Sequence, residues 1–135
     1  MNSTLRNILA VLAGIVVGGA VNMGIITISG SIIPPPPGAD MTTPEGITAA
    51  MSLLEPKHFL MPFLAHALGT FVGAYIASLI AVSNKMRFAM AIGVFTLIGG
   101  ISAVYMIPAP IWFDACDLLL AYIPTAYLAG KLNGG

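Results

Sequence analysis

Two ionisable side chains stand inside apolar stretches of the sequence and could together carry protons. His66 lies in the apolar run 59–82, and Asp117 lies in the run 111–132. Histidine changes charge near neutral pH, and a carboxylate inside a membrane is expensive enough to indicate function by default. About 13 residues, roughly 20 Å of helix, separate Asp117 from Lys131. That is less than the ~30 Å hydrocarbon core of a bilayer, so either Asp117 lies inside the membrane or the bilayer is thinner there. The competing interpretation of His66 is a hydrogen-bonded packing residue.

Four more polar residues complete the candidate site for a substrate or proton. Asp114 lies one helical turn before Asp117, although both could instead complement the positive end of a helix dipole. Asn22 could hydrogen-bond between helices. Glu55 and His58 have the Glu-x-x-His spacing that places two metal ligands on one face of a helix in di-iron bundles. Such a site needs a second copy and more carboxylates, so we predict neither a metal site nor a cofactor.

The composition restricts the class of protein. Of 135 residues, 58% are hydrophobic and only 7% are charged, whereas a soluble domain carries about 25% charged residues. The net charge is zero, so no basic surface exists to bind nucleic acid. A single cysteine excludes an intramolecular disulfide and any CxxC motif. Without a Ser-His-Asp set, a phosphate loop or an HExxH motif, catalysis is the less favoured interpretation. The chain is predicted to be one transmembrane domain, residues 1–135.

Four apolar segments are long enough to cross a bilayer. The predicted fold is therefore an all-α bundle of four transmembrane helices, at about 7–33, 59–82, 88–107 and 111–132. An outer loop, 34–56, joins the first two. Within it, Thr43 as N-cap, Pro44 at the first helical position and Glu45 near the positive end of the dipole predict a short amphipathic helix. This helix is expected to lie at the outer membrane interface or to plug the bundle, and the alternative is a simple surface loop. A proline cannot donate a backbone hydrogen bond, so Pro124 predicts a kink in the last helix.

The distribution of charge predicts the orientation. With four spans, one side holds four of the five basic residues and no acids, and the other holds all five acids. The positive-inside rule then places both termini in the cytoplasm. The predicted location is a bacterial inner membrane or an equivalent membrane. The basic side contains Arg6, Lys85, Arg87 and Lys131; the acidic side contains Asp40, Glu45, Glu55, Asp114 and Asp117, with Lys57.

Small residues recur every three or four positions in each segment, which favours close helix packing in lipid. The polar residues fall on these same stripes, toward the outer ends of the helices. This predicts a polar vestibule that opens outward above a drier inner half. The favoured hypothesis is a transporter or channel-like protein for protons, cations or a small solute, working as a homo-oligomer. The alternative is a non-catalytic membrane subunit or scaffold, bound to a membrane-protein partner.

Overall fold

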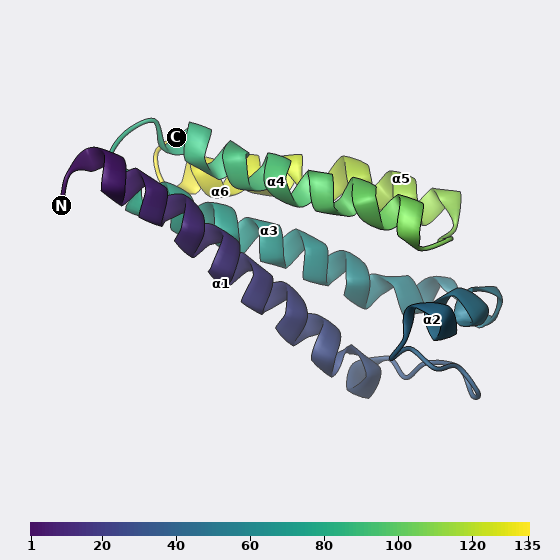
Figure 1. Ribbon diagram of the computed structural model, residues 1–135. Coiled ribbons are helices and arrows are strands. Elements are labelled where there is room, and N and C mark those ends of the chain that lie inside the picture. Colours follow the sequence, from purple (N-terminus) through teal and green to yellow (C-terminus); the bar gives the residue numbers. More distant parts are fainter.

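The computed structural model describes residues 1–135 and is all-helical (Figure 1). Its elements are α1 (Ser3–Ile32), α2 (Pro44–Ala50), η1 (Met51–Leu53), η2 (Pro56–Phe59), α3 (Leu60–Ile80), α4 (Lys85–Met106), α5 (Ile111–Leu120) and α6 (Ile123–Leu132), where η marks a short 3-10 helix. Four helical stretches are long and apolar enough to cross a membrane: Ser3–Ile32, Pro56–Ile80, Lys85–Met106 and Ile111–Leu132. The four predicted apolar segments are therefore confirmed as helical, with ends shifted by up to four residues.

Both termini lie at the same end of the bundle, and α2 lies at the other (Figure 1). Hydrogen bonds tie the terminal segments to α3 and to the turn that follows it at that end. The Arg6 guanidinium donates to the Ile80 carbonyl at 2.7 Å, and the Asn7 side chain accepts from the Val82 amide at 3.0 Å. Near the C-terminus, the Asn133 amide donates to the Tyr75 carbonyl at 2.9 Å. This arrangement requires an even number of passes along the bundle.

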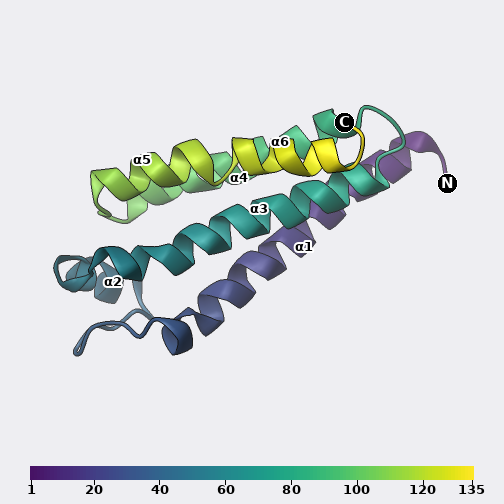
Figure 2. The ribbon, with the colours of Figure 1, turned by 180° about the vertical axis from the view of Figure 1, so that it is seen from behind.

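Helices α1 and α3 pack backbone to backbone through glycines. A Cβ atom at Gly14 would lie 2.7 Å from the Gly73 carbonyl oxygen, and one at Gly18 would lie 2.7 Å from the Gly69 oxygen. Only glycine permits so close an approach, as the stripe of small residues predicts. Beyond this contact, α1 diverges from α3 and α4 toward its C-terminal end, as both views show (Figures 1 and 2).

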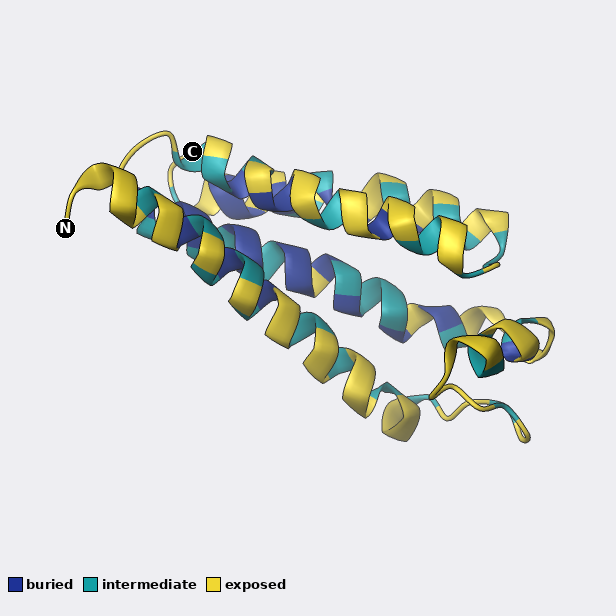
Figure 3. Cartoon of the chain, viewed as in Figure 1, coloured by how far each residue is buried: buried dark blue, intermediate teal, exposed yellow.

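The core lies where α3, α4 and α6 meet, and it is made almost wholly of small side chains. Its buried members are Ala74, Ala77, Ala89, Ile92, Ala126 and Ala129. Only 25 of the 135 residues are buried, while large apolar side chains such as Leu119 and Ile98 are exposed on the perimeter (Figure 3). Helices that pack through small residues and turn large apolar ones outward have the pattern expected of lipid-exposed bundles.

The last apolar segment is not one helix over 111–132 but two, and this corrects the prediction. Helix α5 ends at Leu120 and α6 begins at Ile123. Tyr122 lies between them with φ −110° and ψ −75°, far from the regular α-helix values of about −63° and −42°. Pro124 has no N–H to give the Leu120 carbonyl, so the backbone hydrogen-bond ladder is interrupted here. The Thr125 hydroxyl replaces part of it by donating to the Ala121 carbonyl at 2.7 Å. The predicted kink is thus a complete break.

The predicted short helix in the long loop is present as α2. The Thr43 side chain caps it by accepting a 3.0 Å hydrogen bond from the Gly46 amide. Just before it, the hydroxyl and amide of Thr42 both donate to the Asp40 carboxylate, and these hydrogen bonds lower the pKa of Asp40 below 3.8. The sequence motif therefore fixes the local structure of this part of the loop.

Candidate functional site

A three-residue hydrogen-bonded cluster lies between α3 and the α5–α6 break. The Asp117 carboxyl group is 2.8 Å from His66 Nδ1 through one oxygen, and its other oxygen accepts a 2.7 Å hydrogen bond from the Tyr122 hydroxyl. The His66 and Tyr122 rings stack with centroids 5.8 Å apart. Asp117 is only 5% exposed, so these two partners replace water around its oxygens.

The helix break is what allows Tyr122 to reach Asp117. In a continuous helix, residues three or four apart share a face, whereas residues five apart do not. Because the regular helix is interrupted between Leu120 and Ile123, the phenol ring of Tyr122 turns back toward the carboxylate five residues earlier. Gly100 on α4 leaves space for the ring, since a Cβ atom there would lie 2.5 Å from the Tyr122 hydroxyl oxygen. Backbone irregularity and a facing glycine thus build the cluster together.

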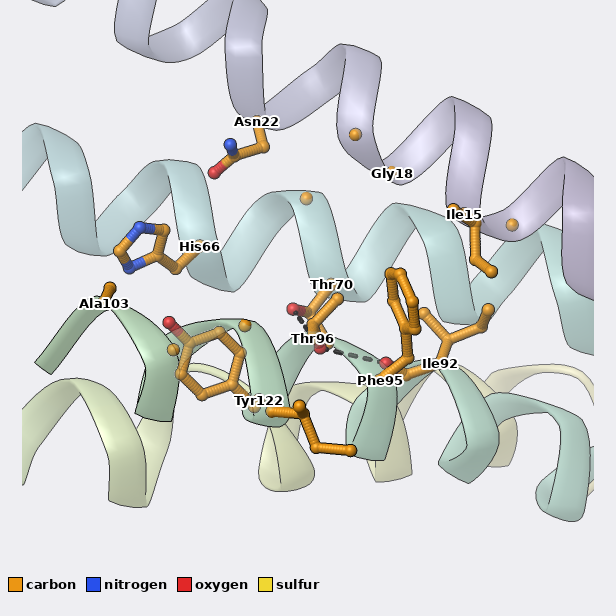
Figure 4. Close-up of a pocket in the computed structure, with 16 residues that line it drawn as sticks. Ile15, Gly18, Asn22, His66, Thr70, Ile92, Phe95, Thr96, Ala103 and Tyr122 are labelled. Atoms are coloured by element: carbon orange, nitrogen blue, oxygen red, sulfur yellow. Dashed lines mark hydrogen bonds between the residues drawn. The ribbon is translucent and has the colours of Figure 1, made fainter. Parts of the chain in front are cut away.

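A cavity of about 450 Å³ lies beside the cluster, between α1, α3 and α4 (Figure 4). His66 and Asn22 stand at one end of it, and the Thr70–Thr96 hydroxyl pair, 3.0 Å apart, stands nearer the middle. The Asn22 side-chain oxygen is buried and has no hydrogen-bond partner. The cavity therefore has apolar walls and a polar end.

The structure brings only some of the six predicted site residues together. His66 and Asp117 bond directly, and Asn22 lines the same cavity as His66. Glu55 and His58 instead bond to each other where η2 begins: the Glu55 amide donates to His58 Nδ1 at 2.8 Å. These two residues cap the start of a helix.

Asp114 lies one turn before Asp117 on α5 and makes no side-chain hydrogen bond, although it lies in the same part of the fold. No group of three or more His, Cys, Asp or Glu side chains is placed to hold a metal ion. The Glu-x-x-His spacing thus serves a local cap in this fold.

Tyr122 is the member of the cluster that sequence reasoning missed. Its signal was present, because it stands two residues before Pro124 and five after Asp117. A polar aromatic residue beside a predicted kink is a ready partner for a nearby buried carboxylate, but helical periodicity places it on another face. Without knowledge of the break, its contact with Asp117 could not be inferred.

The cluster has the chemistry of a proton-binding site. The bond between His66 and Asp117 can hold an imidazolium beside a carboxylate, or a neutral imidazole beside the same group, so the pair can gain or lose a proton. The Tyr122 hydroxyl stabilises the carboxylate form by donating to it. His66 Nδ1 faces Asp117, which leaves Nε2 on the cavity side of the ring (Figure 4).

Comparisons with protein-family models, curated proteins and solved structures found no match for this chain. Fold and site together define it as an all-helical protein with four membrane-length helices, one of them broken beside a buried His–Asp–Tyr cluster.

Proposed function

We propose that this chain is a multi-pass membrane protein, with both termini in the cytoplasm, that moves protons through the His66–Asp117 pair. Four apolar helices of membrane length and the concentration of basic residues near the termini support the placement. The observation that carries the proton role is the 2.8 Å contact between His66 and a carboxylate that is 5% exposed. Ionisable pairs within membrane spans mark proton relays and ion pathways.

The electrostatics of the pair explain why proton binding would be linked to movement. An imidazolium beside a carboxylate has no net charge, so the pair is tolerable in a low-dielectric site. Removing the proton leaves one uncompensated negative charge near Tyr122, and such a charge is costly without water. The site would therefore favour a different arrangement, or a different exposure to water, in each protonation state.

The α5–α6 break gives the pair an element that can move. Discontinuous helices in transporters place irregular backbone beside the substrate or ion site, and rigid segments on either side reorient about it. Here Asp117 lies on α5, while Tyr122 lies in the break itself. A change in the Asp117 hydrogen bonds would therefore act directly on the junction between the two short helices.

The test is a proton-flux measurement on the purified full chain in proteoliposomes with an imposed pH gradient. Wild type should dissipate the gradient faster than empty liposomes, and both His66→Ala and Asp117→Asn should abolish the excess. Asp114→Asn is the matched control, because it removes a carboxylate one turn away that makes no side-chain hydrogen bond; it should retain flux within about twofold. Wild-type flux in both cluster variants, or no flux from wild type, would contradict the proposal.

A second candidate, a membrane subunit or scaffold, is favoured by the outer half of α1. No atom lies within 4 Å of a Cβ built on Gly24, and Met23, Ile26 and Ile28 are exposed around it. A partner helix, from a second copy or from another protein, could cover this face. Extraction in native lipid discs should then recover a stable complex with a partner chain. Recovery of a single copy alone would contradict this candidate.

A further inference from the structure

We infer that the cavity between α1, α3 and α4 binds an uncharged amphiphile from the lipid phase, one that presents a single hydrogen-bond donor, such as a hydroxyl, to Asn22 and His66. The binding itself goes beyond the proton role proposed above. Only its link to protonation, described below, rests on that proposal.

The polar end of the cavity holds an acceptor that no donor reaches. The Asn22 side-chain oxygen is buried without a partner, an arrangement that costs free energy unless a ligand or ordered water supplies a donor. His66 Nδ1 is occupied by Asp117, so Nε2 of a neutral imidazole would be a second acceptor at the same end (Figure 4). A hydroxyl placed there would donate to one of these acceptors.

Charge excludes an ionic head group. None of the 16 residues that line the cavity is Lys, Arg, Asp or Glu. Asp117 stands behind His66, and both of its oxygens are already engaged by His66 and Tyr122. An ammonium or a phosphate in this cavity would therefore lack a counter-charge, which is costly in a low-dielectric site. A neutral head group carries no such cost.

The remaining walls suit an apolar body. Ile15, Ile92, Phe95 and Ile98 line the cavity, and its volume of about 450 Å³ lies within the range of small-molecule sites. Phe95 and Ile98 are also 53% and 59% exposed on the perimeter of the bundle. The cavity thus adjoins the apolar outer surface, and its occupant would enter sideways, between α1 and α4.

Protonation of His66 would favour such a ligand. In the imidazolium form Nε2 carries a hydrogen and changes from an acceptor to a donor, so the hydroxyl accepts from His66 while it donates to the Asn22 oxygen. The titratable groups that face His66 are Asp117 on α5 and Tyr122 at the break. The parts of α1 and α4 that line the cavity contribute none. Occupancy of the cavity and of the proton site would therefore favour each other.

The test uses a photoactivatable octanol, an eight-carbon alcohol with a diazirine, on the full chain in lipid nanodiscs. Adducts are located by mass spectrometry. Gly19→Leu fills the cavity, and Gly24→Leu is the matched control. Both glycines lie on α1 with open space at Cβ, but only Gly19 lines the cavity. Adducts are expected on cavity-lining residues, and they should fall about fivefold or more in Gly19→Leu, because the leucine displaces the probe's apolar contacts. They should persist in Gly24→Leu.

Competition tests the hydrogen bond separately. Excess octanol should compete with the probe about two- to tenfold better than octane of the same length, the range expected for one net hydrogen bond. Asn22→Leu should reduce that preference, and Asn22→Leu combined with His66→Leu should remove it, because both acceptors are then gone. Labelling that is unchanged in Gly19→Leu, or equal competition by octane and octanol, would overturn the inference. Because labelling needs no pH gradient, a chain that labels but passes no protons would contradict only the proton proposal, and a chain that passes protons without labelling would contradict only this one.

Discussion

Tyr122→Phe isolates the contribution of one hydroxyl to the buried cluster. The substitution removes the 2.7 Å hydrogen bond to Asp117 and keeps the ring that stacks on His66 and packs against Gly100. Hydrogen bonds to charged groups contribute about 1.5–3 kcal/mol to stability. Interhelical hydrogen bonds in membranes average about 0.6 kcal/mol, because the unfolded chain also finds partners there. For a carboxylate that is 5% exposed we expect about 1.5 kcal/mol, roughly a tenfold change in the unfolding equilibrium.

The assay is unfolding in mixed micelles with increasing SDS, followed by far-ultraviolet circular dichroism. Tyr127→Phe is the control, because Tyr127 is 47% exposed and its hydroxyl makes no hydrogen bond within the chain. A double-mutant cycle sharpens the test: in an Asp117→Leu background, Tyr122→Phe should cost about 0.5 kcal/mol or less, since its partner is gone. Equal effects of the two tyrosine variants, or the same effect of Tyr122→Phe in both backgrounds, would refute the reasoning.

Three further predictions test the packing, the topology and the loop. Gly18→Ala should lower stability by about 1–3 kcal/mol in the same unfolding assay, because its Cβ would lie 2.7 Å from a backbone oxygen. Gly19→Ala is the control and should leave stability unchanged, because the space around its Cβ is open. Equal effects of the two variants would contradict the glycine contact. With Cys116 replaced by alanine, single cysteines at 42 and 83 should react with an impermeant reagent from opposite sides of the membrane, and reaction from the same side would contradict the four-span topology. The Thr42 amide resonance should titrate with a midpoint below 3.8, because the hydrogen bonds from Thr42 lower the pKa of Asp40. The stabilisation that these hydrogen bonds give the loop is present at neutral pH and is lost as the pH falls through the lowered pKa. A midpoint at or above 3.8 would contradict this account.

The helices and their closest contact could be predicted because local patterns determine them. The apolar lengths indicated four helices, Thr43 and Pro44 indicated α2, and the small-residue stripes indicated the contact that the structure makes at Gly18 and Gly69. Asp117 could be singled out from its distance to Lys131 alone, and His66 from its place among glycines. Each of these inferences needs only periodicity, helix length and capping chemistry.

The rest depended on contacts between segments far apart in the sequence. Pro124 predicted a kink, but only the structure shows the break that turns Tyr122 toward Asp117. Periodicity alone cannot show that α1 diverges from α4 and leaves a cavity beside Asn22. Likewise, Glu55 offered a metal-ligand spacing, but it takes part in a helix cap. Burial and tertiary geometry decide these outcomes.

The most direct test of the proton site is the nitrogen-15 spectrum of the histidine rings in lipid bilayers, compared between wild type and Asp117→Asn. The chain has only two histidines, so His58, which bonds to the Glu55 amide, is an internal control. We predict that the His66 Nδ1 signal moves in the variant and that the His58 signals stay in place. A His66 signal that is the same in both proteins at every pH would show that the two groups do not share a proton, and would contradict the central claim.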